Sequence, residues 1–161
     1  DAIYCMAAVD GEGVLPVGAM NAYEAANSGY VWGIAADRVL VSGGVPLTSL
    51  GGGYASRAAI GQRADGTVIM IVTDGRTANS LGATRDDIIN LMLKYGAVCA
   101  GMLDGGSSAM MYYADYVEKY NVDESELDQY QQLGIVNKYK AFTSPRYLPT
   151  FFMVKAVDDG E

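Results

Sequence analysis

An aspartate followed by two glycines and two serines is the feature of this sequence best suited to chemistry. Residues 97–113 read AVCAGMLDGGSSAMMYY, so an apolar, strand-like run ends at Asp104 and a flexible, hydroxyl-rich loop follows. Glycines let a ligand approach the backbone closely, and successive free N–H groups in such a turn form a concavity that binds anions. Asp104, Gly105 and Gly106 would equally form an ordinary tight turn between two strands. Both interpretations stand at this point.

The sequence contains no histidine, the commonest general base and transition-metal ligand. A serine–histidine–acid triad is therefore impossible. The two cysteines, Cys5 and Cys99, could form a disulfide in an oxidising compartment, but both lie in apolar runs, so we favour buried free thiols. They form no C-x-x-C pair, so no zinc site is expected. No cofactor is expected, although a hard cation such as Ca²⁺ or Mg²⁺ held by aspartates and carbonyl oxygens stays open. Catalysis must rest on carboxylates, Ser, Thr, Tyr, Lys or Arg.

Composition predicts one domain over residues 1–161. Half of the 161 residues are apolar, enough for one sizeable core, and the net charge of -8 argues against a nucleic-acid or anionic-membrane surface. No apolar run approaches the roughly 20 residues that a membrane-spanning helix needs. We expect no nucleic-acid partner and no membrane span.

The hydrophobic pattern predicts an α+β fold, with a mixed β-sheet packed against helices. The clearest helix covers residues 84–95, because Thr84 and Asp87 form a capping-box pair and Gly96 follows the last turn. A polar, tyrosine-rich stretch predicts a helical insertion near residues 115–133. Further expected elements are a strand over residues 2–9, a short helix over residues 19–27, and a last buried strand over residues 150–157.

Two carboxylates are expected at one edge of the sheet. Residues 54–62 and 67–73 flank a turn-forming Ala-Asp-Gly sequence, so they read as a hairpin that ends at Asp74. If residues 67–73 and 97–103 run parallel on either side of the helix, Asp74 and Asp104 follow the same ends of two strands. Ligands commonly bind beyond the carboxyl ends of parallel strands.

Four stretches together resemble the phosphodiester glycosidase family, the N-acetylglucosamine-1-phosphodiester alpha-N-acetylglucosaminidase-like domains. In the family's order they are Arg57-Ala58-Ala59-Ile60-Gly61, Asp74-Gly75-Arg76, Leu103-Asp104-Gly105-Gly106-Ser107-Ser108 and Pro145-Arg146. The resemblance covers roughly residues 32–157. The family domain usually begins earlier, with an Asn-Gly-Gly-Phe-like segment, so we expect this chain to be the later half of the domain and its own N-terminal portion to be a partner. Ser107 replaces a family glycine and Met102 a family asparagine, and either departure can narrow or disable the site.

The resemblance implies a glycoside hydrolase that cleaves a sugar 1-phosphodiester. The expected linkage is N-acetylglucosamine-1-phosphodiester or a related linkage of an exopolysaccharide or glycoconjugate. Asp104 and Asp74 are the catalytic candidates, as nucleophile and base; a carboxylate separation of about 5 Å favours a retaining route, and about 6.5–9.5 Å an inverting one. The substrate-binding candidates, chosen for holding phosphate oxygens, are Arg57, Arg76, Gly105, Gly106, Ser107, Ser108 and Arg146.

Two alternatives use the same residues differently. The chain would be a non-catalytic carbohydrate- or phosphosugar-binding module at the cell surface, or a structural domain whose acids only cap turns. The structural alternative predicts that Asp104, Asp74 and Arg76 do not converge. Under the resemblance the partner is a phosphosugar or glycan substrate, and the expected setting is extracytoplasmic or secreted, in bacteria.

Overall fold

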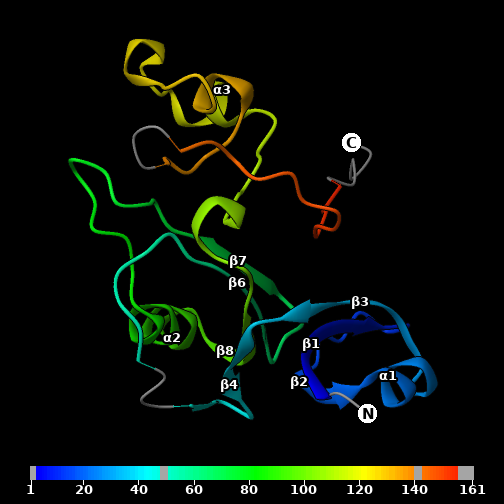
Figure 1. The fold of residues 1–161 in the computed structure, drawn as a ribbon. Coiled ribbons are helices and arrows are strands. Elements are labelled where there is room, and N and C mark those ends of the chain that lie inside the picture. The colour runs from blue at the N-terminus through cyan, green and yellow to red at the C-terminus, as the bar shows by residue number, and fades with distance from the viewer. Residues whose placement is uncertain (1–2, 48–50, 140–142, 156–161) are drawn as a thin grey trace.

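The computed structural model describes residues 3–47, 51–139 and 143–155, which form an α+β fold with two antiparallel sheets (Figure 1). The first sheet has the strand order β2-β1-β3 and the second the order β5-β4-β8-β6-β7. The strands are β1 (Ile3–Asp10), β2 (Val17–Asn21), β3 (Tyr30–Ala36), β4 (Arg38–Ser42), β5 (Val45–Pro46), β6 (Ala58–Arg63), β7 (Val68–Val72) and β8 (Ala97–Met102). The helices are α1 (Ala22–Asn27), α2 (Arg85–Lys94) and α3 (Tyr116–Tyr120), with short 3₁₀ turns at Gly106–Ser108, Glu124–Glu126 and Gln131–Leu133.

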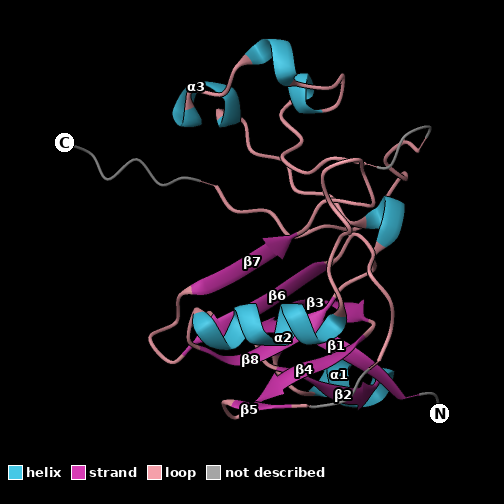
Figure 2. Ribbon diagram, turned by 90° about the vertical axis from the view of Figure 1, so that its left-hand side faces the viewer, coloured by secondary structure: helices cyan, strands magenta, loops and turns pink. Residues whose placement is uncertain are grey.

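The five-stranded sheet is the middle layer of the body, with α2 on one face and the three-stranded sheet on the other (Figures 1 and 2). Successive residues of β6 serve the two faces, as the two-residue period of a strand requires. Ala59 packs in the cluster beneath α2, whereas Ile60 packs with Leu15 and Val17 on the opposite face. Strand β6 is therefore buried on both of its faces.

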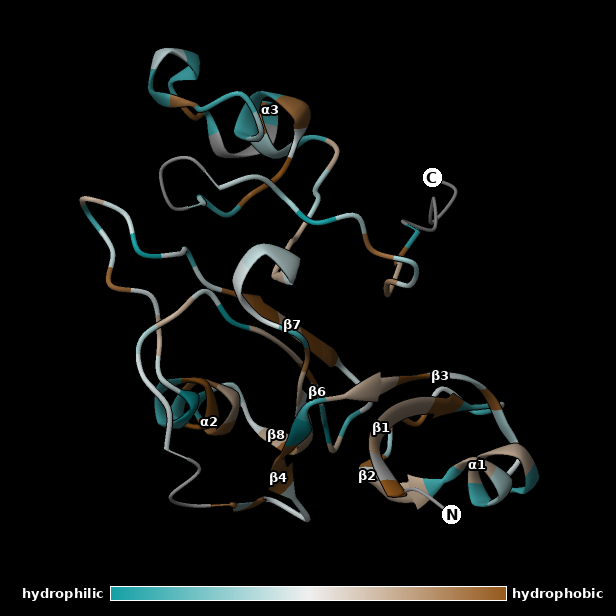
Figure 3. Ribbon diagram, in the orientation of Figure 1, coloured by the Kyte–Doolittle hydropathy of each residue, from teal (hydrophilic) through white to brown (hydrophobic). Residues whose placement is uncertain are grey.

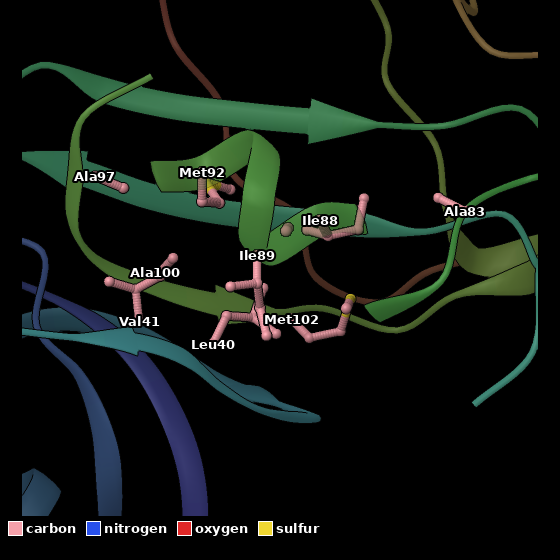
Figure 4. Close-up of a cluster of buried hydrophobic side chains, with 10 residues drawn as sticks. Leu40, Val41, Ala83, Ile88, Ile89, Met92, Ala97, Ala100 and Met102 are labelled. Atoms are coloured by element: carbon pink, nitrogen blue, oxygen red, sulfur yellow. The ribbon is translucent and has the colours of Figure 1, made fainter. Parts of the chain in front are cut away.

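The core between α2 and the sheet fixes the position of that helix (Figure 4). Ile88 and Met92 are fully buried there, and Ile89 is nearly so. The predicted capping box is confirmed: the Thr84 side chain accepts from the Asp87 N–H, and the Asp87 carboxylate accepts from the Thr84 N–H. The helix therefore begins at a defined residue, Arg85, and its buried face holds it on the sheet.

The hairpin predicted before α2 is also confirmed, because β6 and β7 pair antiparallel with Ala58 opposite Val72. Strand β6 pairs antiparallel with β8 as well. Strands β7 and β8 therefore run in the same direction with β6 between them, and their carboxyl ends lie at one edge of the sheet. This arrangement confirms the parallel course predicted for the two segments.

One predicted element begins later than expected and another is wrong. The helix predicted over residues 19–27 is confirmed only for Ala22–Asn27, because residues 17–21 pair with β1 as β2 and Asn21 caps α1 in a capping box with Glu24. Residues 150–155 form no strand, and residues 156 and 157 of that prediction lie outside the described part. Among these C-terminal residues, Phe152 packs on Trp32 with ring centroids 4.7 Å apart, while its apolar neighbours are exposed.

The helical insertion predicted near residues 115–133 consists of α3 and two 3₁₀ turns joined by loops. It lies beyond the sheets and is largely hydrophilic (Figure 3). The cysteines are free, as predicted, and the Cys99 thiol donates to the Leu15 carbonyl at 2.9 Å. Within the described residues, no helix combines the length and apolar character needed to cross a bilayer.

Candidate functional site

A cavity of about 490 Å³ opens at the sheet edge where β8 ends and β6 begins. This volume lies in the usual range of small-molecule sites, roughly 300–1,000 Å³. Its walls come from the end of β3, the turn before β4, the start of β6, the first residue of α2 and the loop after β8. The lining residues are Ala35, Asp37, Arg57, Arg85, Leu103, Asp104, Gly105 and Gly106.

Asp104 stands two residues beyond β8 and places its carboxylate at the cavity. The Gly105 N–H donates to Oδ1 at 2.9 Å, and Arg146 Nη1 lies 3.6 Å from Oδ2. The Asp104 and Arg146 side chains are 69% and 65% exposed, so this ion pair is weak and easily exchanged for a ligand. The backbone N–H of Arg146 donates to the Ser107 carbonyl at 2.8 Å, which fixes the arginine beside the loop.

The loop after Asp104 is tightly packed against the start of β6. The Gly106 N–H donates to the Ser56 carbonyl at 3.0 Å, and a Cβ on Gly105 would lie only 2.9 Å from that same oxygen. The N–H of the buried Ser108 donates to the Gly105 carbonyl at 3.2 Å. Three of the amides expected to hold phosphate oxygens, those of Gly105, Gly106 and Ser108, therefore donate to protein atoms.

Arg57 is the residue just before β6, and its side chain lines the cavity. Its Nε donates to the Ala83 carbonyl at 3.2 Å and its Nη2 to the Gly53 carbonyl at 2.7 Å, which leaves its remaining N–H groups for other acceptors. Partial burial, and then the nearby positive charge of Arg85, lower the pKa of the Arg57 guanidinium from its ordinary value. Such crowding of like charges favours an anion between the two side chains.

Arg85 and Asp37 line the cavity although the sequence reasoning did not select them. Arg85 Nη2 lies 3.6 Å from Asp37 Oδ2, and its Nη1 donates to the Gly51 carbonyl at 3.3 Å. The same Asp37 oxygen accepts from Arg38 Nε at 3.2 Å. The capping box predicts a helix that begins at Arg85, and this helix lies between Asp74 and Asp104 in the sequence. The box could therefore have identified Arg85 as a residue near the expected site.

Asp74 follows β7 at the same sheet edge, but its carboxylate is engaged elsewhere. The Lys138 N–H donates to Asp74 Oδ1 at 2.8 Å, and the Gly75 N–H donates to the Lys138 carbonyl at 2.9 Å. Arg76 donates from Nε to the Tyr54 carbonyl at 2.7 Å. Four predicted site residues are not among the lining residues: Asp74, Arg76, Ser107 and Ser108. The cavity brings together Arg57, Asp104 and the two glycines, with Arg146 at its rim.

A metal centre has no obvious donor set in the part of the chain that is described, where no three His, Cys, Asp or Glu side chains cluster in a way that could hold an ion. Asp37 and Asp104, the two carboxylates of the cavity, each lie next to at least one guanidinium. Positive charge already occupies the places where a hard cation would sit, so the cavity as described is suited to an anion.

Comparison with protein families gives a match to the phosphodiester glycosidase model over residues 5–155. SPbeta prophage-derived uncharacterized protein YomE of Bacillus subtilis (strain 168) is 49% identical over 53 residues, which cover 33% of this chain and 8% of that protein.

Among solved structures, the zebrafish N-acetylglucosamine-1-phosphodiester alpha-N-acetylglucosaminidase catalytic domain, auto-inhibited by its pro-peptide, matches with a TM-score of 0.59 and 17% identity. That match covers 67% of this chain and 41% of the zebrafish chain, and at this identity it shows a shared fold. A hypothetical protein from Synechocystis matches with a TM-score of 0.46 and 26% identity, over 60% of this chain and 19% of the other.

Proposed function

Because this chain belongs to the phosphodiester glycosidase family, we propose that it hydrolyses a sugar 1-phosphodiester in the cavity that contains Asp104. The observation that carries the proposal is the meeting of the Asp104 carboxylate with two guanidiniums, those of Arg57 and Arg85, in a single cavity that Asp37 also lines. A carboxylate suits an oxocarbenium-like sugar, and guanidiniums suit a phosphate.

In the reaction, the bond between the anomeric carbon and the phosphate oxygen breaks, and the phosphate leaves as a monoester with the bonding electron pair. The anomeric carbon gains a water oxygen, either directly or after a covalent glycosyl-enzyme intermediate, and the water releases a proton. Asp104 acts on the anomeric carbon or on that water. The arginines bind the phosphate, and because a phosphate is a good leaving group, strong acid catalysis is unnecessary.

The role of Asp74 as the second catalytic carboxylate stays a prediction. The role of Arg76 as a ligand of the phosphate stays a prediction as well. Rotation of the Asp74 side chain away from the Lys138 N–H would release it toward the shared sheet edge. The substrate class that we propose is N-acetylglucosamine-1-phosphodiester or a related exopolysaccharide or glycoconjugate linkage, met in an extracytoplasmic or secreted setting. Arg146 and the Ser107 hydroxyl would contact the substrate at the rim.

The test is release of sugar from a panel of glycosyl 1-phosphodiesters by the chain and by Asp104→Asn. Asp65→Asn is the matched control, because Asp65 lies in the β6–β7 turn, at the opposite end of the sheet from the cavity. We expect turnover by the unaltered chain and by Asp65→Asn, and its loss in Asp104→Asn. Equal turnover by both variants would remove Asp104 from the chemistry.

A phosphosugar-binding module without turnover is the second candidate. The observation that favours it is the engagement of the Asp74 carboxylate with the Lys138 N–H, which keeps the proposed second catalytic carboxylate out of the cavity. This candidate predicts that phosphosugars bind and protect the chain from unfolding, while no sugar is released from any member of the panel.

A further inference from the structure

Arginines are concentrated at the cavity of this strongly acidic protein. Its lining side chains include two carboxylates, Asp37 and Asp104, and two guanidiniums, Arg57 and Arg85. Each carboxylate also lies next to an arginine outside the lining, Arg38 at 3.2 Å and Arg146 at 3.6 Å. The charges of the lining side chains are balanced, and with these two neighbours four arginines lie in or beside the cavity of a chain whose net charge is -8. Such a concentration of guanidiniums attracts anions to this edge of the sheet.

The two lining arginines reach the same point from different elements. Arg57 precedes β6 and Arg85 begins α2, and the glycine segment 51–53 accepts from both through the Gly53 and Gly51 carbonyls. A Cβ on Gly52 would lie 2.9 Å from Arg85 Nη1 and 3.5 Å from Arg57 Nη2. The two guanidiniums are thus held close together, and an anion between them would relieve their mutual repulsion.

Asp37 allows Arg85 to exchange partners. Its Oδ2 lies 3.2 Å from Arg38 Nε and 3.6 Å from Arg85 Nη2, so one carboxylate oxygen faces two arginines. If a phosphate oxygen replaces Asp37 at Arg85, Asp37 keeps its closer partner, Arg38. The exchange leaves no carboxylate without a cation, so it avoids the cost of an unpaired charge.

We propose that Arg85 is a catalytic residue that works with Arg57 to stabilise the second negative charge that appears on the phosphate as the sugar–phosphate bond breaks. This inference rests on the proposed function. A phosphodiester carries one negative charge, and the departing monoester carries two once the bonding electron pair has moved to its oxygen. Two guanidiniums at one point match the leaving group better than the substrate, which is the condition for lowering a barrier.

Binding of small phosphates tests the proposal without turnover. The probes are dimethyl phosphate, which resembles the substrate's phosphate, and methyl phosphate at pH 8, which carries two charges because its second pKa is about 6. We expect the unaltered chain to bind methyl phosphate about tenfold more tightly in calorimetry. Arg85→Gln should lose this preference while dimethyl phosphate affinity changes less than about threefold.

Arg63→Gln is the matched control, because Arg63 pairs with Asp65 at 3.1 Å in the hairpin turn and is far from the cavity. It should keep the full preference. Asp37→Asn removes the carboxylate that competes for Arg85, so it should increase the preference for methyl phosphate. Arg85→Lys retains the charge and should retain part of the preference, which separates loss of charge from a failure to fold.

Equal weakening of both probes by Arg85→Gln, or an unchanged preference, would overturn the proposal. Kinetics add a second measurement if turnover is found: Arg85→Gln should lower kcat about tenfold or more with little change in KM. Failure of the two ideas can be told apart. Turnover that depends on Asp104 without a preference for methyl phosphate refutes only the role of Arg85, whereas a preference without turnover refutes the glycosidase.

Discussion

Gly61 lies in β6 beneath α2, and its replacement by alanine should destabilise the protein. An alanine Cβ there would lie 2.7 Å from the Cys99 carbonyl oxygen and 3.0 Å from both the Ala100 Cβ and the Met92 sulfur. Real Cβ atoms do not approach a backbone oxygen so closely, so β8 or the helix must shift. Overpacking of this kind costs about 1–3 kcal/mol.

Gly18→Ala is the matched control for Gly61→Ala. Gly18 also lies within a strand, β2, and nothing lies within 4 Å of a Cβ built on it. Alanine reduces the freedom of the unfolded chain, so this variant should be neutral or more stable by up to about 1 kcal/mol. The same chemical change is therefore expected to have opposite effects in two strands, with free energies of unfolding about 1–4 kcal/mol apart.

Urea unfolding followed by circular dichroism gives the free energy of unfolding of both variants, and thermal melting gives their midpoint temperatures. For a chain of this length, a loss of about 2 kcal/mol should lower the midpoint by roughly 4–8 °C. Because Met92 and Arg85 belong to the same helix, Gly61→Ala should also weaken methyl phosphate binding. Equal stability of the two variants would refute the claim that β6 and α2 are packed too closely for a methyl group.

Three further predictions concern the cap, a buried amide and the thiols. Hydrogen bonds from Thr84 lower the pKa of Asp87 below its ordinary value of 3.8. Asp87 therefore stabilises the fold above about pH 4, and this contribution is lost as the pH falls through the lowered pKa. Asp87→Asn should lower the free energy of unfolding at about pH 7 and make it less sensitive to acid in unfolding titrations. Asn137 is 2% exposed and donates to the Ala109 carbonyl at 2.9 Å, so Asn137→Ala should cost about 1–3 kcal/mol in urea unfolding, and an unchanged midpoint would contradict the role given to this amide. Burial raises the pKa of the Cys5 and Cys99 thiols, so their alkylation at pH 8 should be slower in the folded protein than in urea. Equal alkylation rates with and without urea would contradict their burial.

Elements with strong local signals could be predicted from the sequence. The capping box set the start of α2, and the Ala-Asp-Gly turn identified the β6–β7 hairpin. The helix predicted over residues 19–27 was placed three residues too early, because the prediction overlooked Asn21, whose capping box with Glu24 starts α1 after β2 has ended. The apolar run at residues 150–155 looked like a strand by composition alone, since apolar character does not supply a hydrogen-bonding neighbour.

The candidate site was partly predictable for the same reason. The end of a strand-like run pointed to Asp104 and the family resemblance pointed to Arg57, and the structure brings both to the cavity. Arg85 and Asp37 were not predicted, because they meet only where the β3–β4 turn reaches the start of α2, a contact between residues far apart in sequence. The hydrogen bond between the Lys138 N–H and Asp74 is likewise a long-range contact, and no residue near Asp74 in the sequence indicates it.

The cavity draws its walls from residues between Ala35 and Gly106, with Arg146 beyond them at the rim, so β3, β6, α2 and β8 must all be in place before it exists. A bound anion would therefore favour the complete native chain over its unfolded and partly opened forms, by mass action. A ligand at 100 times its dissociation constant would add about 2.7 kcal/mol to the free energy of unfolding. Melting temperature can thus serve as a screen for the phosphosugar ligand that we propose, independently of any assay of its cleavage.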